Sequence, residues 1–572
     1  KITMAKSRKR SEPCSNPLSA ARRSQNYYES LWNKKSGVGY NLFVSYYGQQ
    51  PAGTVVSSID DTLIPIKPTS YSNSKPSGGG MSRASKRRRQ KLGRNVSLPV
   101  EPTIPELTRM DGDGVCQPVN DGRINTQNCG NNTGQKGSHL EALKLLENVV
   151  EKCNYQFLRP FLAAISKPLP LTFRLRHNLL PNEHPLHNDR QHLIDTLKPF
   201  RNLIKPLSFD NSIYQALDSE VLCKASLSKV SPELQSIVHS ASSKGILARQ
   251  ELGSMLPVLG LHHGGYLKPN YHVWDTCASP GSKTLQALEC VGENGQIFAT
   301  DIHPKRIQTL KDAVQRSGMP FIDRILVTQQ DASQKLPHDS SLTKKPHIIL
   351  VDVPCSGDGT VRKDPSILPG WSPITARALH PLQVKILVRA LENVRMGGIV
   401  SYSTCSLNPL ENEAVVQAAL SQISQQQQKV LPPSNTKLSS STRNFSIELI
   451  PFPQIEGLML RPGISHWNVL DPDEAAPKDT MGAENDDDDD DVDKTERNMQ
   501  DAVVDDDATI LWKNYVSFEE AMENKMSHCY PALWPNSNNK SSNHNLSYCR
   551  RLLPQDQDTG GFFVAFFQKK KL

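Results

Sequence analysis

Residues 272–301 read HVWDTCASPGSKTLQALECVGENGQIFATD, and this stretch decides the fold. Two short apolar runs, HVWD (272–275) and QIFATD (296–301), flank a loop of small residues and a segment with apolar residues at helical spacing. This order predicts a strand, a loop, a helix and a second strand, which is the βαβ unit of an open parallel sheet. The loop lacks the GxGxxG and P-loop spacings, but its backbone amides can still approach an anionic group where the helix begins.

The same alternation continues towards the C-terminus. Further strands are predicted at RILVTQQD (324–331), HIILVDV (347–353) and GIVSYST (398–404). The predicted helices are SKTLQALECV (282–291), PKRIQTLKDAVQRS (304–317), ITARALHPLQVKILVRALENV (374–394) and PLENEAVVQAALSQI (409–423). We therefore expect an α/β domain with an open parallel sheet over residues 245–425.

The chain before this domain has two different compositions. Residues 1–138 are rich in Ser, Gly, Asn, Pro and basic residues, which predicts a largely disordered basic region. Its basic cluster within 71–94 fits a solvated tail and a nuclear localisation or RNA-binding segment equally well. Only 26–47 has the aromatic content of a segment that docks. Residues 139–244 combine helical spacing with the alternating KPLPLTFRLR (167–176), which predicts a small α/β domain.

Two insertions are predicted after residue 425. The segment 426–444 is low in complexity, and 472–507 contains the acidic run ENDDDDDDVD. Such sequences bury too little apolar surface to pack, so we expect both to be disordered. The segments 445–471 and 508–572 contain the apolar runs IELIPF and FFVAFF, and we expect them to complete the domain.

Whole-chain composition narrows the class of protein. Of 572 residues 37% are hydrophobic, and the formal charge of +8 favours a polyanionic partner. The mean hydropathy of −0.48 is low for a chain folded throughout. No apolar run reaches the roughly 18 residues of a membrane helix, and KITMAKSRKRSEP (1–13) lacks the apolar core of a signal peptide. We therefore expect its 11 cysteines to be reduced thiols in a nuclear or cytosolic protein.

Acidic residues accompany the ends of three predicted strands. Ligands of an open α/β sheet bind beyond the carboxyl ends of its strands, where the strand order reverses. Asp301 ends the second strand, where a carboxylate can take both hydroxyls of a ribose, and Asp331 ends the third, where it can accept from an exocyclic amine. Asp352 lies at the end of the fourth. One such acid is usually a turn or a helix cap, but three together favour a nucleoside site.

Two cysteines also follow predicted strands. Cys355 lies in VDVPCSGDGT and Cys405 in SYSTCSLNP. A cysteine packed as a small hydrophobe is the usual expectation, which we keep for Cys277 and Cys290. Cys355 and Cys405 lack the close Cys/His spacing of a zinc site, and a disulfide fits poorly with an intracellular setting. Spacing alone leaves open whether this pair is structural or reactive.

These motifs resemble a known family. DTCASPGSKT (275–284), VDVPCSGDGT (351–360) and SYSTCSLNPLENE (401–413) are similar to the cofactor loop and the two cysteine motifs of the Sun-domain RNA (cytosine-5)-methyltransferases. RPGISHWNVLD (461–471) and CRRLLPQDQDTGGFFVAFF (549–567) are similar to the closing part of the branch that methylates tRNA. The resemblance implies a Rossmann-like methyltransferase sheet with a small N-terminal α/β domain.

The resemblance also implies a cofactor, S-adenosyl-L-methionine, and no metal. By matching motifs, its methionine end would lie against Cys277, Ala278, Ser279, Pro280, Gly281, Ser282 and Lys283. Asp301 would hold the ribose and Asp331 the adenine, while Asp352 would border both the cofactor and the target base.

The family's reaction gives the two thiols separate roles. Carbon 5 of cytosine is a poor nucleophile until a thiolate adds at carbon 6, while an acidic group near N3 stabilises the product. The resemblance implies that Cys405 is the nucleophile and that Cys355 assists release as the base at carbon 5. Asp352 would steady the base, and we expect Lys283 to favour the thiolate form of Cys405.

The implied partner is RNA, with tRNA as the first candidate. Methylation of ribosomal or messenger RNA remains an alternative, as does an RNA-binding or assembly factor without turnover. A dehydrogenase would need a glycine fingerprint that the loop does not have. RLRHN (174–178) is a candidate for contacts to the RNA backbone, and a solvated face explains it at least as well. The expected location is the nucleus, with nucleolus and cytoplasm as alternatives, and the sequence sets no oligomeric state.

Overall fold

The computed structural model describes residues 158–176, 185–334, 344–368, 371–428, 445–472, 512–535 and 545–572, with Phe43, Tyr46, Tyr47 and Gln50. All of them belong to one unit, formed by 1–58 and 134–572, and none belongs to the second unit, 59–133. The predictions made for the rest of 1–138, for the helical spacing that follows it and for nearly all of 472–507 therefore fall outside the described residues.

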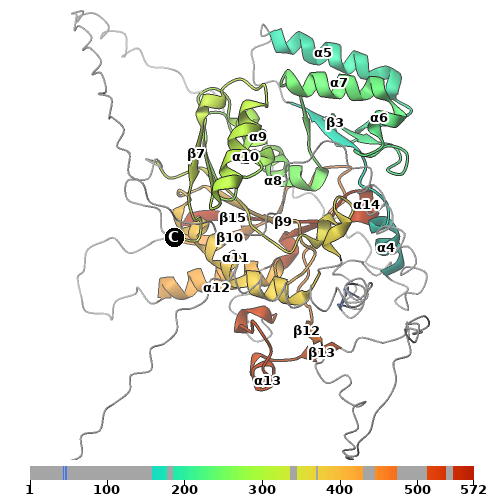
Figure 1. Ribbon diagram of the computed structural model, residues 1–572. Coiled ribbons are helices and arrows are strands. Elements are labelled where there is room, and N and C mark those ends of the chain that lie inside the picture. Colours follow the sequence, from blue (N-terminus) through green and yellow to red (C-terminus); the bar gives the residue numbers. More distant parts are fainter. Residues whose placement is uncertain are drawn as a thin grey trace, which may run out of the picture. The chain divides into compact units, whose positions relative to one another are not determined.

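A sheet of nine strands organises the described part of the chain (Figure 1). Its order is β11-β14-β15-β9-β8-β5-β6-β7, and β10 pairs with β15 beside this path. The parallel strands are β5 (His272–Asp275), β6 (Gln296–Asp301), β7 (Ile325–Gln329), β8 (Ile348–Asp352) and β9 (Ile399–Thr404). The predicted open parallel sheet is confirmed. β5 and β6 have the predicted bounds, and the other three are shorter than predicted by at most two residues at either end.

The strand order fixes where a ligand would bind. From one edge of the parallel part the strands run β7, β6, β5, β8, β9, so the chain winds outward from β5 in one direction and then from β8 in the other. The direction of winding reverses between β5 and β8, and a crevice opens at such a point beyond the carboxyl ends of the strands.

The C-terminal segments extend this sheet with antiparallel strands. β15 (Phe562–Lys571) pairs with β9 on one side and with β14 (Arg550–Leu552) and β10 (Phe445–Ile450) on the other. β11 (Arg461–Pro462) pairs with β14. Strands from the segments 445–462 and 550–571 therefore extend the sheet. β12 (Val469–Pro472) pairs with β13 (Trp512–Tyr515) in a separate sheet, so the two ends of the acidic insertion lie side by side.

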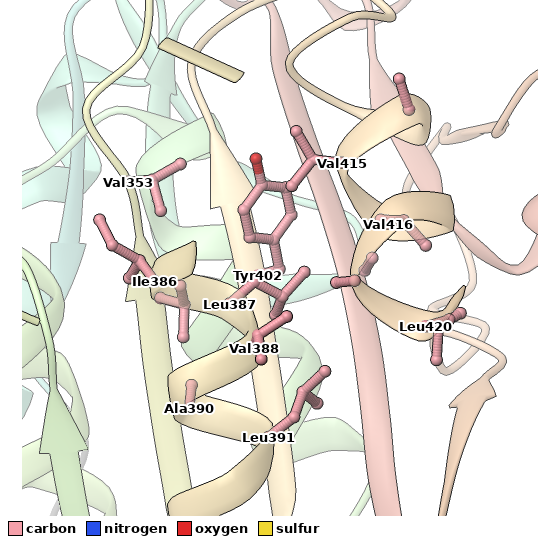
Figure 2. Close-up of a cluster of buried hydrophobic side chains, with 14 of the residues drawn as sticks. Val353, Ile386, Leu387, Val388, Ala390, Leu391, Tyr402, Val415, Val416 and Leu420 are labelled. Atoms are coloured by element: carbon pink, nitrogen blue, oxygen red, sulfur yellow. The ribbon is translucent and has the colours of Figure 1, made fainter. Parts of the chain in front are cut away.

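Helices cover both faces of the sheet. Residues alternate between the faces along β8: Ile348 and Leu350 pack in one cluster, and Ile349 and Val351 pack in the other. The first cluster includes α8 (Leu252–His263), α9 (Ser282–Val291) and α10 (Pro304–Gln315), and the second includes α11 (Pro373–Asn393) and α12 (Glu413–Gln428). Figure 2 shows side chains of α11 and α12 around Tyr402 of β9. Because α12 continues to Gln428, the insertion boundary predicted at residue 426 falls inside a helix.

A second, antiparallel sheet forms the N-terminal α/β region, in the order β2-β3-β1-β4. Its strands are β1 (Thr172–Leu175), β2 (Ile204–Leu207), β3 (Asp210–Ala216) and β4 (Leu247–Arg249). The accompanying helices are α4 (Arg159–Ile165), α5 (Pro185–Leu197), α6 (Leu227–Val230) and α7 (Pro232–Ser243), and α13 (Phe518–Glu523) and α14 (Pro554–Gln557) follow near the C-terminus. Both α5 and α7 lie beside this sheet (Figure 1). No helix in these described segments is long and apolar enough to cross a membrane.

The arginines of RLRHN hold this region against the large sheet, so the predicted RNA contact is wrong for them. Arg174 is 4% exposed, donates from Nε to Gln250 Oε1 at 2.9 Å and forms an ion pair with Glu289 of α9. Arg176 is 9% exposed and donates to the Ser317 carbonyl oxygen at 2.6 Å. Buried guanidinium groups that already have partners are not available to a phosphate backbone.

Candidate active site

The predicted site residues gather at the carboxyl edge of the parallel strands. Asp301 ends β6 and Asp352 ends β8, while Cys405 directly follows β9. Cys355 lies three residues beyond the end of β8. The polar groups therefore surround the place where the direction of winding reverses.

The two thiols are in direct contact. Cys355 Sγ and Cys405 Sγ lie 3.3 Å apart, and both cysteines are free and half-buried. The hydrogen bond with Cys405, followed by burial and by the charge of Cys405, raises the pKa of Cys355 well above its ordinary value. Cys355 therefore keeps its proton at neutral pH and can donate it to the neighbouring sulfur.

Asp352 is held by a cation and a hydroxyl group. Lys283 Nζ donates to Asp352 Oδ2 at 2.7 Å, and Ser403 Oγ donates to Oδ1 at 2.7 Å. Lys283 also donates to Ser254 Oγ at 3.2 Å, and its Nζ lies 5.3 Å from the ring centroid of Phe562. Burial disfavours the charged lysine, but Asp352 outweighs burial and leaves the pKa of Lys283 raised. The site therefore contains an Asp–Lys pair beside the thiols, in which the lysine is buried and the aspartate is partly exposed.

The predicted cofactor loop lies between β5 and α9. Cys277, Ala278, Ser279, Pro280 and Gly281 form the loop, and Ser282 and Lys283 begin the helix. Ala278 N donates to the Thr300 carbonyl oxygen at 2.8 Å, and Ser279 N donates to Asp301 Oδ2 at 3.4 Å. Gly281 has a φ of 109°, and a Cβ there would lie 2.9 Å from Leu310 Cδ1, so the close turn onto α10 requires glycine.

Three carboxylates face this loop. Burial raises the pKa of Cys277 to about 12, and the charges of Asp275, Asp301 and Asp352 act in the same direction. Lys283 pairs with Asp352 and Arg306 pairs with Asp301, so the site combines acceptor oxygens with their own cations. Acceptor oxygens of this kind suit a ligand that carries a cation and hydroxyl groups. A sulfonium or ammonium group together with a ribose meets both requirements, so the residues present fit S-adenosyl-L-methionine.

Asp301 and Asp331 differ in their surroundings. Arg306 Nε donates to both oxygens of Asp301, at 3.2 and 3.0 Å, and the same arginine donates to the Ser279 carbonyl oxygen at 2.8 Å. Asp331 does not end β7 as predicted, because it lies two residues beyond Gln329. Its Oδ1 accepts from Ser333 N at 2.8 Å, which is the geometry of a turn.

Asp275 is a site residue that the sequence interpretation did not include. It ends β5 and is 1% exposed. Thr284 Oγ1 donates to its Oδ2 at 2.7 Å, whereas its Oδ1 has no hydrogen-bond partner among the described residues. Burial raises the pKa of Asp275 to about 7. Its place at a strand end, matching that of Asp301, was the signal that could have identified it.

Two buried carboxylates connect the loops that carry the thiols, and both were missed. Glu411 accepts from Ser356 N at 2.9 Å and from Ser356 Oγ at 2.5 Å, next to Cys355. Asp358 Oδ1 accepts from Leu407 N at 2.7 Å, two residues after Cys405. Each bond joins the two cysteine motifs, so these carboxylates fix the loops relative to one another.

A buried ion pair supports the loop that follows Cys405. Arg551 and Glu413 are both fully buried, and Arg551 Nε donates to Glu413 Oε1 at 2.7 Å. Arg551 also donates from Nη1 to the Leu407 carbonyl oxygen at 2.9 Å. The segment after Cys405 is thus held at both its amide and its carbonyl group. No group of His, Cys, Asp or Glu in the described segments is arranged to hold a metal ion.

Comparisons with known proteins identify sequences similar to this chain. The family described as 16S rRNA methyltransferase RsmB/F matches residues 266–459. A relative from Schizosaccharomyces pombe, the multisite-specific tRNA:(cytosine-C(5))-methyltransferase trm4b, is 31% identical over 72% of this chain and 56% of its own length. The tRNA (cytosine(34)-C(5))-methyltransferase of Drosophila melanogaster is 30% identical over 58% of this chain and 38% of its own length. The chain thus spans about half of the relatives it matches or less.

The chain is also similar to a bacterial rRNA methyltransferase and to a protein of known structure. The ribosomal RNA small subunit methyltransferase F of Escherichia coli is 36% identical over 30% of this chain and 34% of its own length. A methyltransferase homologue of known structure from Pyrococcus horikoshii is 20% identical, covering 76% of this chain and 99% of its own, with a TM-score of 0.43. The family match and the eukaryotic relatives confirm the resemblance of this chain to the RsmB/F and Sun-domain methyltransferases.

Proposed function

We propose that this protein is an S-adenosyl-L-methionine-dependent methyltransferase that forms 5-methylcytosine in RNA. The observation that carries the proposal is the 3.3 Å contact between Cys355 Sγ and Cys405 Sγ, beside the Asp352–Lys283 pair. Methylation at carbon 5 of a pyrimidine requires a nucleophile for carbon 6, a base for carbon 5 and a polar group for the ring. These groups are present together at the edge of the sheet.

The substrate that we propose first is tRNA. The relatives named as tRNA methyltransferases align with 58% and 72% of this chain, whereas the one named as an rRNA methyltransferase aligns with 30%. Methylation of ribosomal or messenger RNA remains the alternative. A cytosine inside a stem would have to leave its stack to reach the thiols, which costs a few kcal/mol.

The cofactor, when bound, supplies an electrophilic methyl group. We assign its methionine end to the loop from Cys277 to Lys283 and its ribose to Asp301. Asp331 would accept from the adenine, and Asp352 would border the methionine end and the target base. Asp275, with one oxygen unpartnered among the described residues, offers a further acceptor for a cationic part of the ligand.

In the proposed reaction Cys405 attacks first. Its thiolate forms a bond with carbon 6 of cytosine, and the ring takes up a proton at N3 from the Asp352–Lys283 pair. This makes carbon 5 nucleophilic. The order of the two thiols rests on the resemblance of the motifs, and in this order Cys355 is the donor that stabilises negative charge on the Cys405 sulfur.

Cys355 acts in the second half. The hydrogen bond with Cys405, burial and the charge of Cys405 raise the pKa of Cys355, and the first and third of these effects disappear once the Cys405 sulfur is bonded to carbon 6. Cys355 can then lose its proton to solvent and take the proton from the methylated carbon 5. The electron pair released expels Cys405 as a thiolate, and the proton on N3 returns to the Asp352–Lys283 pair.

The activity is tested with cofactor carrying a labelled methyl group and with total RNA, followed by mapping of the methylated cytosines. We expect label in tRNA cytosines at carbon 5. Label confined to ribosomal or messenger RNA would change the substrate, and no transfer to any RNA would favour a binding or assembly factor over an enzyme.

The order of the thiols has its own test. Cys355→Ala should accumulate a covalent RNA–protein adduct, because attack proceeds while release does not. Cys405→Ala should form no adduct. Denaturing gel electrophoresis of each variant with RNA and cofactor separates these outcomes, and the reverse pattern would exchange the two roles.

A further inference from the structure

Three aromatic residues that are far from the site in sequence pack against Trp371, close to the first cysteine motif. Phe43, Tyr46 and Tyr47 are helical and fully buried. The ring centroids of Phe43 and Tyr46 lie 5.3 and 5.2 Å from that of Trp371, and the centroid of Tyr47 lies 6.0 Å from it. Residues 26–47 stood out in the sequence as a segment that docks, and these three residues show that part of it does.

The hydroxyl group of Tyr47 reaches the first cysteine motif. It donates to Asp358 Oδ2 at 2.5 Å, and Trp371 Nε1 donates to the same oxygen at 3.3 Å. Asp358 lies three residues after Cys355, and its other oxygen accepts from Leu407 N. One carboxylate therefore connects Tyr47 with the backbone of both thiol-bearing loops.

The neighbouring tyrosine reaches the second motif. Tyr46 OH donates to Asn408 Oδ1 at 3.3 Å, and this oxygen also accepts from Leu410 N at 3.0 Å. Asn408 N in turn donates to Ser406 Oγ at 3.0 Å, next to Cys405. Consecutive tyrosines thus bind one residue from each cysteine loop.

The same segment is fastened a second time, away from the thiols. Gln50 Nε2 donates to the Asn468 carbonyl oxygen at 3.0 Å, and Asn468 N donates to Gln50 Oε1 at 3.0 Å. These two hydrogen bonds fix the Gln50 side chain to the backbone of Asn468. The two tyrosine hydroxyls are therefore presented to the loops from a support that does not belong to either loop.

We propose that Tyr46 and Tyr47 are positioning residues for the thiol pair. They act through Asn408 and Asp358, which hold the two cysteine loops at the separation where Cys355 and Cys405 are in contact. The expected change in kcat rests on the proposed function. The expected change in the reactivity of the two thiols does not.

The direct test measures thiol reactivity without RNA. The full chain carrying Tyr47→Phe or Tyr46→Phe is treated with iodoacetamide at pH 8, and alkylation of each cysteine is followed by peptide mass spectrometry. Phenylalanine keeps the ring packing and removes only the hydroxyl. We expect Cys355 to react on the order of threefold faster in Tyr47→Phe, because it is no longer held against Cys405. The buried Cys290 and Cys549 report any general unfolding.

The second readout is the split between kcat and KM. Tyr47→Phe should lower kcat about tenfold, because it removes a hydrogen bond to a charged group, and Tyr46→Phe should lower kcat by about two- to threefold. KM for RNA and for cofactor should change less than about twofold in both. Tyr214→Phe is the matched control, because Tyr214 is buried and stacks on Phe173 in the N-terminal sheet.

The two readouts distinguish a failure of this inference from a failure of the proposed function. If both variants keep wild-type thiol reactivity and kcat and only unfold at a lower temperature, the tyrosines serve packing alone and the inference is wrong. If the wild-type protein transfers no methyl group to RNA, the proposed function fails, while the alkylation rates still decide whether the tyrosines position the thiols.

Discussion

At the scale of single residues, Asp275 carries a strong electrostatic signature. Burial raises its pKa from 3.8 to about 7, and the charge of Asp352 adds to the effect. A carboxyl group with a raised pKa favours the folded state while it is protonated. Its contribution is complete below pH 3.8 and is lost as the pH rises towards 7. A buried carboxylate held against this tendency is typical of a binding site.

Asp275→Asn should therefore stabilise the protein in a pH-dependent way. The amide keeps the shape and the contact with Thr284, and it cannot ionise. We expect the free energy of unfolding at pH 8 to increase by roughly 3 kcal/mol, and the gain at pH 5 to be clearly smaller. Urea unfolding at the two pH values measures the difference. Equal gains at both would contradict the electrostatic explanation, and weaker cofactor binding would agree with a ligand role.

Lys283→Ala tests the cation beside the thiols. Lys283 Nζ lies 2.7 Å from Asp352, and the charge of Cys405 contributes to its raised pKa, so the lysine is within electrostatic reach of that sulfur. Since a nearby cation favours a thiolate, we expect Cys405 to be alkylated several-fold more slowly at pH 7. Lys305→Ala removes an equal charge from the exposed start of α10 and is the control. Unchanged alkylation in Lys283→Ala would show that the lysine serves Asp352 alone.

The site residues predicted from the sequence belong to local motifs, whereas those that were missed depend on partners far away in the sequence. Cys355, Cys405 and Asp352 belong to local motifs at strand ends, so the predicted strands already indicated their shared edge. Asp358 and Glu411 lie within the same motifs, but their importance comes from partners about fifty residues away. Local periodicity contains no information about such pairings, and these supporting contacts become visible only in the folded chain.

At the scale of elements, the two cysteine loops approach each other through glycine. Gly359 N donates to the Cys405 carbonyl oxygen at 2.9 Å, and Gly561 N donates to the Gly359 carbonyl oxygen at 2.7 Å. A Cβ on Gly359 would lie 2.7 Å from the Cys405 oxygen and 2.5 Å from the Gly561 oxygen. Both are backbone atoms, so the loops themselves would have to separate.

Gly359→Ala should consequently damage activity more than stability. We expect a loss of about 1–3 kcal/mol in the free energy of unfolding, and a much larger fall in methyl transfer because the thiols move apart. Gly265→Ala is the comparison, since Gly265 has a φ of 66° and open space around it. That variant should lose about 1 kcal/mol through backbone strain and keep its activity. Equal activity in the two variants would show that loop separation does not limit the reaction.

The bounds of a strand could be predicted where its own apolar residues define it, but its pairing partners could not. β5 and β6 are short buried runs between turn residues, and their bounds match the prediction. β15 was predicted as a strand, but its insertion between β9 and β14 depends on pairs such as Phe563 with Thr404. Pairing over that sequence separation is set by the completed sheet and by Arg551, which fixes β14 to the loop after Cys405.

At the scale of the whole molecule, the sequence did not show that two arginines of the N-terminal region are buried. The basic RLRHN segment was a candidate for contacts to the RNA backbone or for a solvated face. Arg174 and Arg176 instead meet Glu289, which is 1% exposed on α9, and so connect the N-terminal sheet to the helix that follows the cofactor loop. A buried cation needs a specific anion, and that partner lies more than a hundred residues away.

Glu289→Gln should show what this connection contributes. Removing the carboxylate leaves two buried guanidinium groups without their anion, so we expect a loss of about 3–5 kcal/mol in the free energy of unfolding by urea. Glu220→Gln is the matched control, because the pair of Glu220 with Lys167 is about half exposed and should change stability by less than about 0.5 kcal/mol. Under conditions where both variants are folded, the salt dependence of RNA binding should equal that of the wild type, since no phosphate contact has been removed. A weaker salt dependence in Glu289→Gln, with little loss of stability, would instead return Arg174 and Arg176 to the RNA-binding surface.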